Sequence, residues 1–401
     1  MNFIGRRSRI LVMLSLSFFF LTALGTGCSS NSPAQASTDL LLGDLKADTR
    51  SAETRDESSP PRFVRAFPSK DAPQTSLDGC LLASPLFYDG TSGPWLITAD
   101  SSGKVTALDP ATGSKAWDLV LPAPEGEDPV IVATPLLIQG KVVVGYHTTP
   151  TPEGAQQGSS QHNVMDPRLR HRVAVVNLES QSIDDDFPWL ELSAELPSWD
   201  GNSTLRFRPG NALGRGQLVR GTLSPGSLGR IFLTYGNGRD IQPWHGWAFE
   251  IDMDAWKSDG PEAALVGTLV TTPESDCGPE GVSGSTSRIC GGGIWSPSGP
   301  LVLPGEESFQ LILPTGNGAL NLNQKSYSNS LMKVGPGLSF NPECDLEQCE
   351  NFDPDEPKLA CIESCKNLFI PRLMEGQSPP DPKDGRCEDL SLFQCWEKLD
   401  Y

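Results

Sequence analysis

Histidine is scarce in this chain, which has four of them in 401 residues: His147, His162, His171 and His245. They are too few and too scattered in the sequence to form an evident zinc site. The G-x-S-x-G, H-E-x-x-H and P-loop motifs, each tied to a known chemistry, are also missing. We therefore find no constellation of residues that would make an enzyme, and we expect no catalytic residue and no bound metal.

Basic residues are in short supply, with 31 Lys and Arg against 50 Asp and Glu and a net charge of −19. Nucleic acid and anionic lipid both require a basic surface, so this balance argues against them as partners. Two acidic clusters, residues 184–186 and 353–356, could hold calcium through oxygen ligands. Neither has the glycine spacing of an EF-type loop, so we expect both to be solvated loops.

The first thirty residues have the pattern of a bacterial signal peptide. Three arginines precede an apolar stretch, Ile10–Leu24, which is shorter than a typical membrane-spanning helix. Leu24–Cys28 then resembles a lipobox, in which a signal peptidase cuts before a cysteine that carries lipid. Removal of residues 1–27 would take the net charge to −22, and Cys28 would anchor the protein to the outer membrane, facing the periplasm or the exterior. The alternative is an ordinary secretory signal, with Cys28 a free thiol.

Ten cysteines fit an exported protein, because disulfides persist in oxidising compartments. With Cys28 lipidated, eight of the other nine lie close together in sequence and are disulfide candidates: Cys277, Cys290, Cys344, Cys349, Cys361, Cys365, Cys387 and Cys395. Spacing does not give their connectivity. Cys80 is the odd one out, and it is either buried and free or lacks a partner within this chain.

A four-residue motif, Ala-Ser/Thr-Pro-Leu, occurs twice about fifty residues apart and is the most informative feature of the remaining chain. Residues 83–86 and 133–136 each open an apolar run, and Asp89-Gly90 or Gln139-Gly140 follows as a turn. In the first unit we expect four short strands, separated by glycine turns: residues 85–90, 94–99, 104–109 and 115–120. Four antiparallel strands in hairpin succession make one blade of a β-propeller, so the predicted fold class is all-β.

Residues 99–117 are specific enough to name a family. They resemble the blade motif of PQQ-like (quinoprotein-like) β-propellers, A-x-D-G-x-L-x-A-L-D-x-x-T-G-x-x-x-W. The positions that carry the resemblance are Asp100, Gly103, Leu108, Asp109, Thr112, Gly113 and Trp117. The resemblance implies that small residues of the motif pack between blades, that Gly113 lies in a turn that needs a permissive φ, and that Trp117 docks on the next blade.

Two later segments resemble a branch of that family found in secreted bacterial propellers. Residues 235–252 resemble its G-D-x-x-P-Y-H-G-W stretch, and residues 291–318 resemble its G-G-I-W-x-x-G-x-G-P and A-T-G-N-G stretches. Trp244 replaces an aromatic Tyr, and Pro297 enters the glycine turn. The candidate lining of a central funnel is Trp244, His245, Trp247 and Trp295. His245 would either gate a pocket or act as a base there, or it would hydrogen-bond backbone at a blade junction.

The family implies two classes of function. Its dehydrogenases resemble one another in a vicinal Cys-Cys pair over the quinone, a Glu/Asn/Asp set that holds calcium and often a C-x-x-C-H haem motif, whereas other members are scaffolds without a cofactor. This chain has neither Cys-Cys nor C-x-x-C-H, and the calcium set has no local motif to match. We expect a non-catalytic scaffold with no cofactor. The alternative is a degenerate or truncated dehydrogenase that uses PQQ with calcium.

The sequence divides into a signal peptide at 1–27, a disordered tether at 28–75, propeller blades at 76–340 and a Cys-rich acidic segment at 341–401. The body has room for about four blades, fewer than the seven or eight usual in the family, so we expect either a short open propeller or a truncated one. The partners would be envelope proteins or surface glycans, bound by loops at 148–172 and 341–395. The first of these loops, which includes His162 and His171, is predicted to be a polar surface hairpin.

Overall fold

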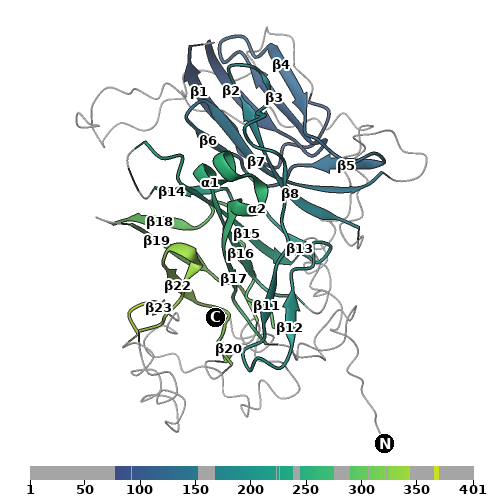
Figure 1. The fold of residues 1–401 in the computed structure, drawn as a ribbon. Helices are drawn as coiled ribbons and strands as arrows, with labels where there is room; N and C mark the ends of the chain where they lie inside the picture. The colour runs from purple at the N-terminus through teal and green to yellow at the C-terminus, as the bar shows by residue number, and fades with distance from the viewer. Residues whose placement is uncertain are drawn as a thin grey trace, which may run out of the picture.

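The computed structural model describes residues 77–91, 93–151, 168–222, 224, 226–237, 244–274, 290–305, 308–318, 320–321, 324–343 and 365–369. Within these ranges most regular structure is antiparallel strand, and the sheets follow one another through the molecule in chain order (Figure 1). No helix in these ranges is long and apolar enough to cross a membrane. The predicted signal peptide, Cys28, the tether and most of residues 341–401 lie outside them.

Sheet one is a four-stranded meander. Its strands are β1 (Leu86–Gly90), β2 (Gly93–Ala99), β3 (Lys104–Leu108) and β4 (Lys115–Val120), in the order β1-β2-β3-β4. All neighbours are antiparallel, which confirms the four predicted strands to within one residue at each end. Gly103 and Gly113 have φ values of +73° and +78°, a conformation that glycine adopts without strain.

Sheets two and three keep four strand positions but break their outer strands into pieces. In sheet two, β7 (Lys141–Pro150) pairs with β8 (Arg170–Asn177). The outer pieces are β5 (Glu127–Val130) and β6 (Leu136–Ile138) on β7, and β9 (Ser182–Ile183) and β10 (Leu190–Glu191) on β8. In sheet three, β15 (Arg230–Asn237) pairs with β16 (Trp247–Asp252). The outer pieces are β13 (Ala212–Leu213) and β14 (Val219–Gly221) on β15, and β17 (Leu265–Val270) on β16.

Sheet four has the order β18 (Leu301–Pro304), β19 (Phe309–Pro314), β22 (Leu331–Val334) and β23 (Leu368–Phe369). Two small hairpins accompany the sheets, β11 (Glu195–Pro197) with β12 (Thr204–Arg206), and β20 (Leu320–Asn321) with β21 (Ser326–Tyr327). The helices are α1 (Met253–Asp259), α2 (Pro261–Ala264) and a 3-10 turn at Pro336–Leu338. Asp252 begins α1 by accepting hydrogen bonds from the backbone N–H groups of residues 254 and 255.

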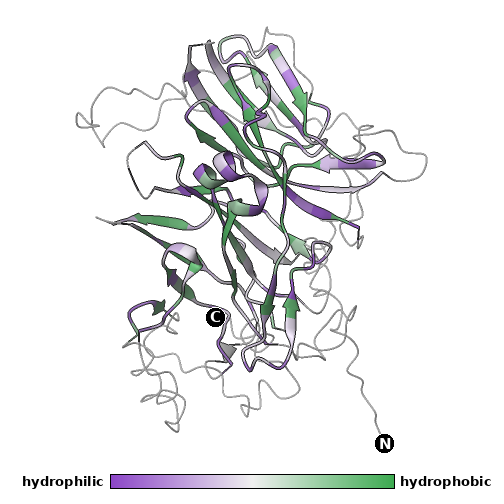
Figure 2. Ribbon diagram, viewed as in Figure 1, coloured by the Kyte–Doolittle hydropathy of each residue, from purple (hydrophilic) through white to green (hydrophobic). Residues whose placement is uncertain are grey.

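Consecutive sheets pack face to face, and apolar residues concentrate along their central strands (Figure 2). Successive side chains of a strand point to opposite faces of its sheet. In β7, Val142 and Val144 therefore join the core shared with sheet one, whereas Val143 joins the core shared with sheet three. The predicted all-β architecture of four-stranded blades is confirmed by this topology.

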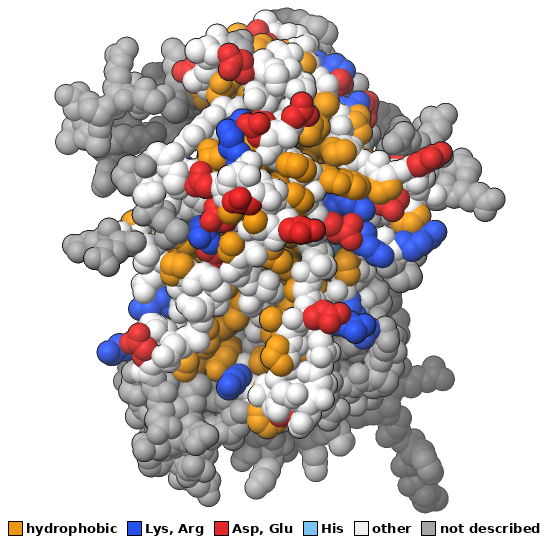
Figure 3. All heavy atoms as spheres, in the orientation of Figure 1, with side chains coloured by type: hydrophobic (Ala, Val, Ile, Leu, Met, Phe, Trp, Pro, Cys, Tyr) orange, Lys and Arg blue, Asp and Glu red, His pale blue; other side chains and the backbone are white. Residues whose placement is uncertain are grey.

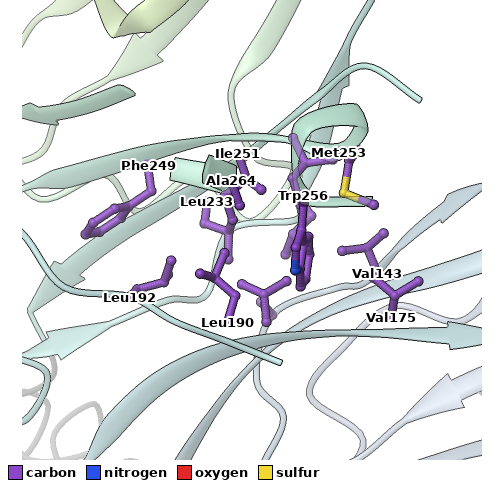
Figure 4. Close-up of a cluster of buried hydrophobic side chains, with 14 of the residues drawn as sticks. Val143, Val175, Leu190, Leu192, Leu233, Phe249, Ile251, Met253, Trp256 and Ala264 are labelled. Carbon is purple, nitrogen blue, oxygen red and sulfur yellow. The ribbon is translucent and has the colours of Figure 1, made fainter. Parts of the chain in front are cut away.

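Sheet three divides its side chains in the same way. Leu233 and Phe249 face sheet two, as Figure 4 shows, and Phe232 and Ala248 face sheet four. Trp256 of α1 closes the first of these cores and donates its indole N–H to the carbonyl of Pro188 at 2.8 Å. Each sheet is thus fixed to the next by its own apolar layer.

The predicted polar insertion at 148–172 is shorter than expected, because both of its ends are strand. β7 and β8 pair in register from Lys141–Asn177 to Thr148–Arg170. His171 lies in β8 and is 3% exposed, so its prediction as part of a surface hairpin is wrong. The reason is that its ring packs against the rings of Phe207 and Tyr235, in the core between sheets two and three. His162 lies outside the described residues.

Candidate functional site

Three motifs that are far apart in sequence meet at the junction of sheets three and four. His245 forms a parallel bridge with Gly291, and Gly291 forms an antiparallel bridge with Gly318. The backbone N–H of Gly292 donates to the carbonyl of Asn317 at 2.8 Å. The Trp-His-Gly-Trp, Gly-Gly-Ile-Trp and Thr-Gly-Asn-Gly segments therefore form one structural unit.

Glycine is required at this junction because the backbones approach closely. A Cβ on Gly246 would lie 2.0 Å from the carbonyl oxygen of Gly292, and one on Gly291 would lie 2.3 Å from that of Asn317. Gly291 and Gly292 also have φ values of +72° and +69°. No larger residue fits at these positions without moving the backbone, which explains the glycine-rich motif.

His245 is buried at the junction, with Nδ1 2.7 Å from the carbonyl oxygen of Thr272. Nδ1 therefore carries the proton and donates it to this acceptor. Burial lowers the pKa of His245 to about 4, and the nearby charge of Arg208 acts in the same direction. His245 is thus neutral at pH 7 and hydrogen-bonds backbone, as one of its two predicted roles requires, while it also lines a cavity.

A cavity of about 190 Å³ opens beside the junction. Its described lining comes from the β11–β12 hairpin, the loop from there to the start of β13, and the segment that ends at the start of β16: Ser203, Thr204, Leu205, Arg206, Arg208, Asn211, Ala212, Trp244, His245 and Trp247. Trp244 and Trp247 are buried, whereas the two arginines are exposed. The indole N–H of Trp244 has no hydrogen-bond partner among the described residues.

A buried aromatic cluster supports the loop that carries the cavity's polar side chains. The ring of Phe207 lies between those of Tyr235, Trp247 and Phe249, with centroid distances of 5.2, 5.7 and 4.9 Å. His171 joins from sheet two, 4.7 Å from Tyr235. Edge-on contacts of this kind fix ring orientation as well as burying area.

His171 also holds the backbone of this loop. Its Nε2 lies 3.2 Å from the carbonyl oxygen of Pro209 and 3.1 Å from that of Ala212, so Nε2 carries the proton. Burial lowers the pKa of His171 to about 4 against the raising effect of these two bonds. A neutral histidine of sheet two thereby positions Arg208 and Asn211 at the cavity.

Three of the four candidate funnel residues line this cavity. Trp295 is not among the described lining residues. Its indole lies against the backbone of Gly236 in β15 and of Gly316 just after β19, where Cβ atoms would lie 2.6 and 2.7 Å from the ring. The structure therefore brings together Trp244, His245 and Trp247, and it assigns Trp295 to packing.

The described lining does not fit a quinone held by calcium. Calcium takes several carboxylate and carbonyl oxygens, whereas the described side chains of this cavity include two arginines and no carboxylate. In the described part of the chain, no group of three or more side chains is placed to hold a metal ion. We therefore derive no step through PQQ.

The first half of the blade motif closes the turn between β2 and β3. Asp100 is buried, and its Oδ1 accepts hydrogen bonds from the backbone N–H and hydroxyl of Ser102 at 2.9 and 2.5 Å. A Cβ on Gly103 would lie 2.4 Å from Pro129 of sheet two. This turn therefore lies against the neighbouring sheet.

The second half of the motif forms the turn into β4. Asp109 accepts a hydrogen bond from the backbone N–H of Thr112 at 2.9 Å, and Gly113 N–H donates to the carbonyl of Asp109 at 2.7 Å. Leu108 is buried, and Trp117 packs against the core between sheets one and two. These residues shape and pack the blade and lie outside the lining of the cavity.

Cysteines and acidic clusters depart from two expectations. None of the described cysteines, Cys80, Cys290 and Cys365, is a free thiol, so both alternatives for Cys80, a buried free thiol and a cysteine without a partner in this chain, are wrong. The other disulfide candidates lie outside the described residues, so their bonding stays a prediction. In the acidic cluster 184–186, Asp185 and Asp186 are exposed as predicted. Asp184 is 7% exposed and ion-paired with Lys141, so it is not solvated as predicted, because it lies against the end of β7. Residues 353–356 lie outside the described ranges.

Three buried polar side chains of sheet two were not predicted from the sequence: His147, His171 and Asp128. His147 and His171 are directly opposite on β7 and β8, with ring centroids 5.7 Å apart. Asp128 of β5 is fully buried, and neither carboxylate oxygen has a hydrogen-bond partner among the described residues. The histidines are 24 positions apart in sequence, and only the strand register, which sequence spacing does not give, brings them together.

Sheet four carries an apolar surface on the side away from sheet three. This outer face consists of Leu301, Leu303, Gln310, Ile312, Pro314, Leu331, Lys333 and Phe369, which the strand register places on one side. Leu301 and Phe369 are 60% and 56% exposed. The opposite side is buried against sheet three. A sheet that is apolar on both sides is typical of one that is covered on both sides.

No family model and no curated protein matches the chain. Among solved structures it is similar to a europium-containing methanol dehydrogenase, with 12% identity, a TM-score of 0.34 and 64% of this chain covered. A quinohemoprotein alcohol dehydrogenase from Comamonas testosteroni matches at 10% identity and a TM-score of 0.34 over 62% of this chain. BamB from Moraxella catarrhalis matches at 12% identity and a TM-score of 0.23 over 64% of it.

The described residues form β-propeller blades. The sheet topology carries this conclusion, with four strand positions in each of four successive antiparallel sheets of the described chain. The chain spans 39% and 33% of the two dehydrogenases and 59% of BamB. At these identities and TM-scores the similarities do not indicate an activity for this chain.

Proposed function

We propose that the protein is a non-catalytic scaffold of the bacterial cell envelope that binds another envelope protein on the outer face of sheet four. The exposure of Leu301, Leu331 and Phe369 on one side of one sheet carries the proposal. Apolar side chains gathered on a single face mark protein interaction sites.

The packing within the molecule indicates what kind of surface fits there. Each of the three junctions between described sheets joins two apolar sheet faces. The outer face continues this pattern, so the expected occupant is the apolar face of a β-sheet in the partner protein. The loops at 148–172 and 341–395, also predicted to bind partners, lie largely outside the described residues.

Charge substitution on the outer face tests the proposal. Burying one Leu side chain is worth about 1.5–3 kcal/mol, so Leu301→Asp should reduce capture of the partner from cross-linked membranes by at least about tenfold. Val120→Asp is the matched control, because Val120 is 47% exposed on β4 in sheet one. Equal capture by both variants, or no co-purifying polypeptide with the unaltered protein, would overturn the proposal. A product containing only this chain would identify the occupant as a second copy, and would also contradict it.

The envelope address is part of the proposal, and it rests on the lipobox-like residues 24–28. Cys28→Ala should move the protein from the membrane fraction to the soluble fraction, because a lipid anchor stabilises membrane association by about 0.8 kcal/mol per buried CH₂. Fractionation followed by mass measurement of the N-terminal peptide checks this. A membrane-bound Cys28→Ala protein would show that something other than lipid holds it.

A further inference from the structure

We infer that Asn202 is a glycosylation site, whose side-chain amide receives an oligosaccharide after export. The chain contains one Asn-x-Ser/Thr sequence in which x is not proline, and it is Asn202-Ser203-Thr204. Enzymes that transfer sugars to surface loops of exported proteins read this motif. The inference rests on the proposed envelope address. It does not depend on the outer face of sheet four, which does not include these residues.

The motif lies at the turn that joins β11 to β12, where an enzyme can reach it. The backbone N–H of Ser198 donates to the carbonyl of Ser203 at 2.8 Å and closes this turn. Residues 199–204 are all exposed. A Cβ on Gly201 would meet no described atom within 4 Å apart from its chain neighbours, so the space beside Asn202 is open. A bulky polar group therefore fits here without displacing any core residue.

The reacting amide is held by an exposed, local hydrogen bond. Nδ2 of Asn202 donates to Oδ2 of Asp200 at 2.8 Å, and the backbone N–H of Asn202 donates to Oδ1 of the same carboxylate at 3.0 Å. Both residues are exposed, so water competes for these contacts. Exchange of the Nδ2 bond for a contact with an enzyme therefore costs little.

Two polar groups flank Asn202 in sequence and give an enzyme something to hold. Asp200 lies two positions before it, and the hydroxyl of Ser198 donates to Oδ1 of Asp200 at 2.6 Å. This bond and those from Asn202 hold the pKa of Asp200 below its ordinary value, so the side chain is charged at neutral pH. Thr204 lies two positions after Asn202, and its side chain is exposed. A cationic group on Asp200 and a hydrogen bond to the Thr204 hydroxyl would fix the amide between them.

The transfer requires a sugar donor with a good leaving group, for which an oligosaccharide joined through C1 to a polyprenyl diphosphate is the expected class. The amide nitrogen of Asn202 forms a bond to C1 and loses one proton. The bond between C1 and the diphosphate oxygen breaks, and its electron pair leaves with the diphosphate. Neither an oxidant nor a reductant takes part.

Peptide masses of the full protein, purified from membranes of its source organism, test the inference. We expect the peptide that contains residue 202 to be heavier by the mass of a glycan. Asn202→Gln and Thr204→Ala should each lose this addition, whereas Thr204→Ser keeps the hydroxyl and should retain it. All three substitutions are at exposed positions, and thermal unfolding of each variant checks that it folds.

An unmodified residue 202 in the unaltered protein would overturn the inference. A mass addition that persists in Asn202→Gln would also overturn it, because the sugar would then be on another side chain. The N-terminal peptide of the same digest reports the envelope address separately. A lipid-bearing Cys28 together with an unmodified Asn202 would contradict glycosylation alone, whereas an uncleaved signal peptide would contradict the address as well. Leu301→Asp should be glycosylated like the unaltered protein, so loss of partner capture is a separate result.

Discussion

At the residue scale, two buried histidines hold the elements around the cavity. His171 bonds to the backbone of residues 209 and 212, and His245 bonds to Thr272. Burial lowers the pKa of each to about 4, against about 6.5 in an unfolded chain. Between these values the unfolded state binds more protons, so acid favours unfolding.

The stability of the fold should therefore decrease as the pH falls from about 6.5 towards 4. Each histidine should account for about 2 kcal/mol of lost unfolding free energy between pH 7.5 and pH 5. His171→Gln keeps an N–H donor for the loop but takes up no proton. The unfolding free energy of this variant should therefore fall by about 2 kcal/mol less than that of the unaltered protein between the two pH values. Urea unfolding of both proteins at the two pH values measures the difference. Equal losses would show that His171 titrates normally when folded.

Some of these residues could be recognised from sequence and others could not. Gly103 and Gly113 lie in turns with positive φ, as their place between predicted strands indicates. Trp244, His245 and Trp247 lie three residues apart at most, so their shared cavity follows from local spacing. Arg206, at the end of β12, and Arg208, in the loop that follows, were missed because only the fold brings them to the cavity. His171 was missed because its environment depends on strand register.

At the scale of elements, the local sequence predicts the strands of sheet one, whereas the other sheets depend on pairing between segments farther apart in the sequence. The strands of sheet one were predictable because short turns join them. In sheet two, Pro129 falls within β5, which is tolerated because β5 is an edge strand that, among the described strands, pairs with β7 alone. β5 and β6 both pair along the same edge of β7, with an unpaired segment between them. No local sequence pattern predicts this arrangement.

The two faces of sheet four should respond differently to substitution. Phe309 is 1% exposed and contacts Phe232 at a centroid distance of 5.3 Å, so Phe309→Ala should cost about 3–5 kcal/mol. Leu301 is 60% exposed, and Leu301→Ser should change the unfolding free energy by no more than about 0.5 kcal/mol. Denaturant titration of the isolated protein compares them. A large loss for Leu301→Ser would mean that the outer face is already buried when the chain is alone.

At the scale of the whole molecule, the described sheets form a stack with an apolar face at the end formed by sheet four. Figure 3 shows acidic and basic side chains distributed over one side of the molecule with apolar patches between them. The excess of acid in the chain favours solubility and discourages non-specific association. The outer face of sheet four departs from this pattern, which supports the proposal that a partner binds there.

Photo-crosslinking from the outer face tests that assignment most directly. A photoreactive residue at position 301 of the lipidated chain, activated in intact cells, should give one dominant adduct with a different envelope protein. The same residue at position 120 on β4 should not give it. Adducts of equal pattern from both positions, or adducts from position 301 only with lipid and solvent, would contradict the account.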